Sequence, residues 1–178
     1  MKIRPDEWYD VNGKSGTRDF WAYPEGPGKP KYGHWLLPDG TDVEDEIADG
    51  RIEELPFPVR FVRDGASRGE RRGDFLWSGA APYTLVSERF VNALTELGVG
   101  GFKTYPVSVY DRDKARTPVP GYVGFIPDLT WTEPVHSRFR GDVSFTLEIR
   151  GDVLQGLLDR GVDQFDYKPH EEPGEPEF

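Results

Sequence analysis

The stretch YTLVSERFVNALTELGVGGF, residues 83–102, gives the clearest indication of the fold. Ser87 is a preferred N-cap residue, and Gly98 suits the position just after a helix, where the backbone is often left-handed. Apolar side chains recur at helical spacing between these two residues: Phe90, Leu94 and Leu97. This period predicts a short helix with one apolar face. A strand is expected on each side of it, and in the second one, at 102–110, Pro106 favours the edge of a sheet.

A second stretch, FTLEIRGDVLQGLLDRGVDQF at 145–165, is similar to the first one. The segments before the helices, 83–85 and 145–147, correspond at an offset of 62 residues. Matches within and after the helices have an offset of 63, as for Gly98 and Gly161, so we expect one residue of slippage. Duplication and independent convergence on the same turn chemistry both explain the similarity. Either origin predicts a strand–helix–strand unit twice, each with a short helix packed against a sheet.

The rest of the chain is rich in turns, with 21 Gly and 16 Pro among 178 residues. Short β-prone runs lie at 7–11, 19–23, 34–37, 59–62, 74–77, 122–126 and 143–149. Thr41 and Glu44 have capping-box spacing, which predicts a further short helix from 41 to about 48. We therefore expect a loop-rich α+β fold with mixed, largely antiparallel sheets of short strands and two or three short helices. The predicted organisation is one domain at 1–168, with a β-rich half (1–80) and the two units (81–168), before a flexible acidic tail (169–178).

The net charge of −10 is opposite to that of proteins that bind nucleic acid or anionic membranes. The chain has no apolar run long enough for a membrane span, and its N-terminus lacks the apolar core of a secretory signal. It also has no cysteine, which excludes disulfides and thiolate metal sites. These features predict a cytoplasmic protein that binds neither nucleic acid nor membranes.

The sequence predicts no catalytic, cofactor-binding or metal-binding residues. His34, His136 and His170 are far apart and have no second ligand at helical or hairpin spacing. Ser87 is better explained as a helix cap than as a nucleophile. The glycine-rich run at 98–101 follows a helix, whereas a phosphate-binding loop precedes one.

A loose nuclease-like constellation, Asp142 with Glu148 and Arg150, is set aside for two reasons. The permanently charged arginine is a poor substitute for the lysine of such sites. The acidic net charge also disfavours an enzyme that cuts DNA. We therefore expect a protein that is not an enzyme.

Charge is concentrated at 39–54, where eight acidic residues accompany the single basic residue Arg51. This acidic segment is the predicted partner-binding site, through Asp42, Glu44, Asp45, Glu46, Asp49, Glu53 and Glu54. A basic stretch follows at 60–72. The contact prediction fails if these arginines pair with the acidic segment. A solvated surface segment is the alternative interpretation.

The pattern at 83–107, with Ser87-Glu88-Arg89-Phe90 before the helix, resembles the immunity proteins of bacterial polymorphic-toxin systems. It is especially similar to relatives of the myxobacterial immunity proteins that protect kin from swapped toxins. One branch of that group carries Cys-x-x-Cys-Gly pairs and zinc, which this cysteine-free chain cannot share. The resemblance implies non-catalytic binding and neutralisation of a cognate protein toxin in the cytoplasm. A basic toxin would fit the acidic segment.

Two other function classes stay open. The chain could be a small-molecule-binding or enzymatic domain with a pocket lined by its five tryptophans: Trp8, Trp21, Trp35, Trp77 and Trp131. A pocket with convergent titratable groups would favour that alternative. A structural module is the third possibility, and stable self-association would distinguish it.

Overall fold

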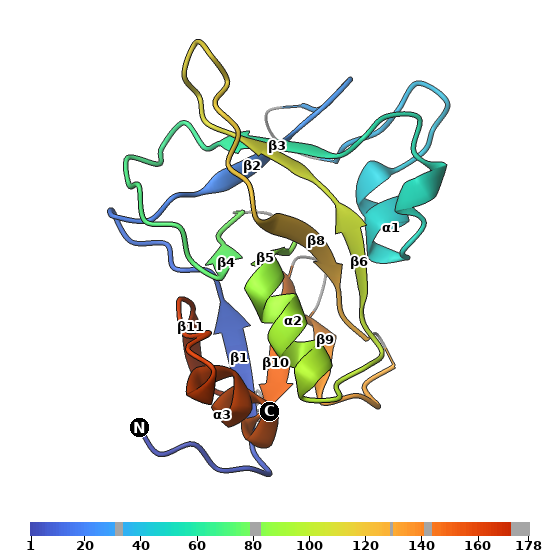
Figure 1. Cartoon of the computed structure of the whole chain (residues 1–178). Helices are drawn as coiled ribbons and strands as arrows, with labels where there is room; N and C mark the ends of the chain where they lie inside the picture. Colours follow the sequence, from blue (N-terminus) through green and yellow to red (C-terminus); the bar gives the residue numbers. More distant parts are fainter. Residues whose placement is uncertain (31–33, 79–82, 129, 141–143, 172–178) are drawn as a thin grey trace, which may run out of the picture.

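The computed structural model describes residues 1–30, 34–78, 83–128, 130–140 and 144–171. Within these residues, eleven short strands form three sheets, accompanied by three α-helices and one 3-10 helix (Figure 1). All but one of the strand pairings in these sheets are antiparallel. The expected α+β fold with short strands and short helices is confirmed.

The first sheet has the strand order β11-β1-β10-β9 and is antiparallel throughout. Its strands are β1 (Trp8–Asn12), β9 (Val135–Arg140), β10 (Ser144–Arg150) and β11 (Asp166–Pro169). Helix α3 (Gly151–Asp159) follows β10 directly and packs against β1 and β10. Segments from opposite ends of the sequence, β1 and β11, are therefore neighbours in one sheet.

The second sheet has the order β4-β5-β8-β6 and is also antiparallel. Its strands are β4 (Phe75–Leu76), β5 (Leu85–Ser87), β6 (Lys103–Pro106) and β8 (Tyr122–Ile126). Helix α2 (Glu88–Glu96) begins as predicted, because the Ser87 hydroxyl accepts a hydrogen bond from the Phe90 amide. Gly98 adopts a φ of +72° just beyond the helix. Pro106 lies on the edge strand β6, as its missing amide hydrogen requires.

The first and second sheets share one arrangement. β1 lies between β10 and β11, and β8 likewise lies between β5 and β6. The N-caps Ser87 and Arg150 are 63 residues apart, and so are Val86 and Ile149, which face the same core. The expected offset of 62 before the helices is therefore wrong, because it would place corresponding residues on opposite faces of their strands. No slippage occurs within the helix.

Helices α2 and α3 pack against each other and share one core with the first two sheets (Figure 1). The side chains of this first core include Val11, Val86, Phe90, Phe125, Ile149 and Leu154. β5 alternates between two cores, since Leu85 belongs to the second one. The second sheet is consequently buried on both faces, although its strands are short.

The third sheet completes the second core, and two of its three strands come from the N-terminal half of the chain. It has the order β2-β3-β7, in which β3 and β7 are the parallel pair. The strands are β2 (Ala22–Glu25), β3 (Arg60–Arg63) and β7 (Ser108–Tyr110). Helix α1 (Val43–Ala48) and the 3-10 helix η1 (Ile52–Glu54) lie at one side of this half of the molecule (Figure 1). The second core includes Trp35, Val43, Ile47, Phe61, Leu85 and Tyr105.

Two local predictions in the N-terminal half are wrong. Residues 34–37 form no strand, because the turn through Gly40 folds them back to make one bridge, between Leu36 and Asp42. Helix α1 also begins one residue later than the capping-box pattern indicates. Asp42 is the N-cap, and its carboxylate accepts hydrogen bonds from the amides of Glu44 and Asp45.

The predicted tail does not begin at 169. Pro169 pairs with Tyr9 in the sheet, and the His170 amide donates to the Trp8 carbonyl at 2.8 Å. The composition of this segment is poor in apolar residues, so its order comes from backbone pairing with β1 and from the side chain of His170. The remaining residues of the expected tail, 172–178, lie outside the described part of the chain.

Candidate functional site

The acidic segment is anchored to the second core through one face of α1. Val43 and Ile47 are buried there, with exposed fractions of 0% and 1%. The Val43 amide donates to the carbonyl of the buried Trp35 at 2.9 Å. Because the apolar residues point inward at helical spacing, the acidic residues between them lie toward solvent.

The seven predicted contact residues lie together on α1, η1 and their flanking turns. Four are exposed: Asp45, Asp49, Glu53 and Glu54. Three are partly buried: Asp42, Glu44 and Glu46. Asp42 has a structural role as the N-cap of α1, and Tyr83 donates its hydroxyl to Glu44 at 3.3 Å. The structure thus separates four accessible carboxylates from three that also stabilise the segment.

Part of the acidic charge is offset locally. Arg51 pairs with Glu46 at 2.9 Å and with Asp49 at 2.7 Å, and its hydrogen bond lowers the pKa of Glu46. Burial raises the pKa of Glu44, even though His34 lies 3.5 Å from its carboxylate. The stronger source of negative potential around this segment is therefore the three exposed carboxylates that have no ion pair among the described residues: Asp45, Glu53 and Glu54.

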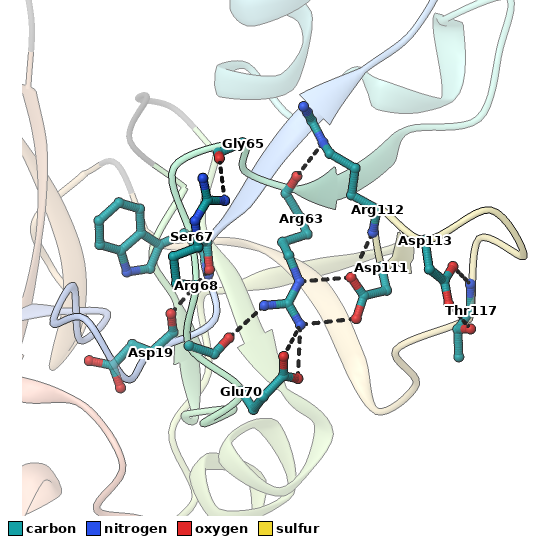
Figure 2. Close-up of polar contacts among 12 residues, drawn as sticks. Asp19, Arg63, Gly65, Ser67, Arg68, Glu70, Asp111, Arg112, Asp113 and Thr117 are labelled. Carbon is teal, nitrogen blue, oxygen red and sulfur yellow. Dashed lines mark hydrogen bonds and ion pairs between the residues drawn. The ribbon is translucent and has the colours of Figure 1, made fainter.

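Arg63, in the basic stretch at 60–72, pairs with carboxylates outside the acidic segment. Figure 2 shows the guanidinium of Arg63 between the carboxylates of Asp111 and Glu70. Arg63 Nε lies 2.7 Å from Asp111, and Nη2 lies 2.8 Å from Glu70. A third donor of Arg63 bonds to the Gly69 carbonyl at 2.7 Å. This hydrogen bonding by Arg63 holds the pKa of Asp111 below its ordinary value.

A second arginine of the stretch is also paired away from the acidic segment. Arg71 lies 2.6 Å from Asp19, and this hydrogen bond lowers the pKa of the carboxyl group. In the described part of the chain, no ion pair joins 60–72 to the acidic segment. The contact prediction would fail if the arginines of 60–72 paired with the acidic segment, and among the described residues they do not.

A small hollow of about 160 Å³ lies beside the C-terminal end of α1. Its lining includes Asp49, Lys103 and Asp128, so it joins the acidic segment to the loop that follows β8. The surface that could meet a partner therefore continues beyond the acidic segment.

Asp128 organises that loop. One carboxylate oxygen accepts from the amide and hydroxyl of Thr130, and the other accepts from the amides of Thr132 and Glu133. Burial alone would raise the pKa of Asp128, but these hydrogen bonds together hold it far below its ordinary value. A carboxylate with this many donors fixes the loop more firmly than neutral side chains would.

Trp131, at the tip of the loop, is 55% exposed and has a φ of +60°. Its indole N–H donates to the Ser137 carbonyl at 3.0 Å, which fixes the orientation of the ring. A left-handed backbone is strained for a bulky residue and persists only where the surroundings impose it. The sequence placed Trp131 in a pocket only under the alternative function and did not predict this exposed position, although the hydroxyl residues that follow Asp128 favour a side-chain-capped turn.

Among the described residues, the five tryptophans belong to separate contacts. Trp35 stacks on Phe57, Trp21 packs edge-on against Trp77, and Trp8 lies against His136. Trp131 is at the surface. Hollows of about 160, 250 and 300 Å³ in the described structure have no tryptophan in their lining.

The structure assigns Ser87 a structural role. Its hydroxyl lies 2.7 Å from a carboxylate oxygen of the buried Asp74, and it also caps α2. Asp74 in turn pairs with Arg89. Asp142, from the nuclease-like constellation, lies outside the described residues.

The sheet brings together two histidines that the sequence separates. His170 lies 2.8 Å from Asp10 and 3.3 Å from Glu148, and His136 lies 3.1 Å from the other oxygen of Glu148. All four side chains are at least nine-tenths buried. Sequence spacing could not reveal this group, because its members come from β1, β9, β10 and the residue after β11.

The chain matches no protein-family model, and no curated protein is significantly similar to it. None of the helices in the described residues is long and apolar enough to cross a membrane. The candidate functional surface is therefore argued from the geometry above.

Proposed function

We propose that this protein is a non-catalytic immunity protein that binds and neutralises a cognate, basic protein toxin in the cytoplasm. The observation that carries the proposal is the anchored acidic segment, in which Asp45, Glu53 and Glu54 are exposed and form no ion pair with the basic stretch at 60–72 in the described structure. The similarity of 83–107 to immunity proteins supports the same function.

The electrostatics suit an inhibitor of this kind. A concentrated negative surface accelerates association with a basic partner and disfavours wrong partners. It also occupies the basic groove that a nuclease toxin would offer to phosphates. Asp45, Glu53 and Glu54 are exposed, so they can pair with the toxin without unfolding α1.

Charge alone rarely gives tight binding, and Trp131 supplies an apolar anchor. Interface hot spots are enriched in tryptophan, and a side chain held in one orientation loses little entropy on binding. The hollow lined by Asp49 and Asp128 joins the acidic segment to the start of the loop that carries Trp131. A stable complex needs about 800 Å² from each partner, which an area larger than α1 must provide.

Co-expression tests the proposal. The protein encoded beside this chain is induced in bacteria with and without it, and growth is followed. Rescue of growth is the expected result. Failure to rescue cells from a neighbour that is toxic on its own would contradict the proposed function.

A further inference from the structure

A row of ionisable side chains crosses the first sheet. Cross-strand pairing places Lys168 opposite Asp10, Asp10 opposite Glu148, and Glu148 opposite His136. His170 is two residues beyond Lys168, so it belongs to the same face of the sheet. Asp10, Glu148 and His136 are exposed by only 5%, 0% and 2%.

The equivalent row in the second sheet is apolar. With the offset of 63, Glu148 corresponds to Leu85 and Lys168 to Tyr105. Leu76 occupies the place of His136, and Gly124 that of Asp10. Leu76, Leu85 and Tyr105 are buried in the second core. The shared fold therefore does not require ionisable residues in this row.

The direct pairing of Asp10 with Glu148 is unfavourable in itself. Like charges opposite each other on neighbouring strands destabilise a sheet, and burial increases the penalty. Imidazoles approach both carboxylates, and Lys168 Nζ lies 4.0 Å from Asp10. Two adjacent buried carboxylates with nearby imidazoles form a donor set that also suits a divalent cation.

The geometry fits coordination. The ligand atoms of Asp10, Glu148 and His170 all lie within 4.8 Å of one another. His170 Nδ1 is 2.8 Å from the Asp10 oxygen and 3.3 Å from the Glu148 oxygen. Ligands of tetrahedral zinc lie about 3.4 Å apart for bonds of about 2.0–2.1 Å. Small side-chain shifts would bring the three atoms to these separations.

His136 acts on this group through Glu148. Its Nε2 lies 3.1 Å from the Glu148 oxygen that does not face His170, and its Nδ1 lies 3.1 Å from the Glu133 carbonyl. Contacts of this kind orient carboxylate ligands in metal sites. The exposed side chain of Lys168 beside Asp10 marks the solvent side from which an ion can enter.

We propose that Asp10, Glu148 and His170 bind one divalent transition-metal ion of the zinc type, with His136 as a positioning residue. The ion fastens the segment after β11 to β1 and β10 and compensates the two buried carboxylates. This inference departs from the prediction of no metal site and does not depend on the proposed toxin partner.

The test uses the full chain, stripped with a chelator and then titrated with Zn²⁺ by calorimetry. One ion per chain is expected, and Tm should rise by about 5–10 °C at a hundredfold excess of free Zn²⁺ over Kd. The variants H170A and D10N should lose this increase. H34A is the matched control and should leave the increase unchanged, because the exposed His34 belongs to a second group of possible ligands, with Asp42 and Glu44.

A second measurement uses the unsubstituted protein, because H170A removes a buried side chain and can unfold β11. In ¹⁵N-labelled protein, Zn²⁺ should shift the Nδ1 resonance of His170 and leave that of His34 in place. Absence of both a Tm increase and this shift overturns the proposal. A Tm increase that persists in folded H170A, or that disappears in H34A, overturns it as well.

Discussion

Asp10 and Glu148 are directly opposite each other on β1 and β10, and both carboxylates are buried. Burying such a pair is costly unless other polar groups contact it, and here His136 and His170 contact Glu148. The row that contains them is therefore expected to behave as one coupled unit.

A double-mutant cycle measures this coupling. E148L and H136L introduce leucine, the residue found at both equivalent positions of the second sheet. Each single change leaves a buried ionisable partner without its contact and should destabilise the chain by about 3 kcal/mol. The double change should cost clearly less than the sum of the two. Urea unfolding in chelator measures the three values, and strict additivity would show that the two residues are independent.

Acid stability should depend on Asp19 and Asp111. Hydrogen bonds from Arg71 and Arg63 hold the pKa of these carboxyl groups below 3.8 in the folded protein. The unfolded chain therefore takes up protons first as the pH falls, and their stabilisation, complete above about pH 4, is lost progressively below it. The urea midpoint should decrease in that range.

The variant D111N isolates one of these contributions. It should be less stable than the unsubstituted chain by about 1–2 kcal/mol at pH 7, because Arg63 keeps only part of its hydrogen bonding. Its unfolding midpoint should also change less between pH 4 and pH 2.5. An equally steep decrease in the variant would exclude the Arg63–Asp111 pair as a source of acid sensitivity.

The role of Asp128 in the loop that carries Trp131 can be tested separately. D128N replaces the oxygen that faces the amides of Thr132 and Glu133 with a donor, or removes the acceptor for Thr130. It should destabilise the protein by about 1–3 kcal/mol. Limited proteolysis should then cleave the chain within 128–133, where the unsubstituted chain resists. Unchanged resistance would contradict the role assigned to Asp128.

Trp131 itself is expected to contribute to binding rather than to stability. W131A should leave Tm nearly unchanged, because the side chain is 55% exposed, and should weaken toxin binding by about 30-fold or more. W131F keeps an aromatic ring and should retain most of the affinity. If W131A and the unsubstituted chain bind the toxin equally, the interface does not include this loop.

Local features of the fold were predictable from the sequence. The cap at Ser87, the apolar period and Gly98 predict α2 within a residue at its ends, because all three signals act inside one short segment. The strand predicted at 34–37 does not form. These residues have β propensity, but the turn that follows lets them make only one bridge, between Leu36 and Asp42. The tail prediction rested on composition and missed the backbone pairing of Pro169 with Tyr9.

The candidate sites also differ in how far the sequence predicts them. The acidic segment is continuous in sequence, so counting charges along the chain is enough to identify it. The contact between His170 and Asp10 joins residues 160 positions apart, so no local sequence pattern predicts it. The sequence shows a tryptophan at position 131 but does not show that it is exposed. Its exposure depends on the hydrogen bonds that Asp128 makes within the loop.

The proposed function requires the acidic segment to bind a basic toxin. Its test is calorimetry with the purified C-terminal domain of the neighbouring gene product. The variant D45K/E53K/E54K reverses three exposed charges and spares Asp42, which caps α1, and Asp49, which pairs with Arg51. The control D6K/D159K/D163K makes the same change in net charge at other exposed positions.

We expect nanomolar binding, about −12 kcal/mol, that weakens as salt is added. The triple reversal in the acidic segment should raise Kd by at least about 100-fold, equivalent to about 2.7 kcal/mol, while the control raises it far less. Equal effects of the two variants would show that only overall charge matters and would contradict the assigned surface. Absence of binding to a correctly folded neighbour would contradict the proposed function itself.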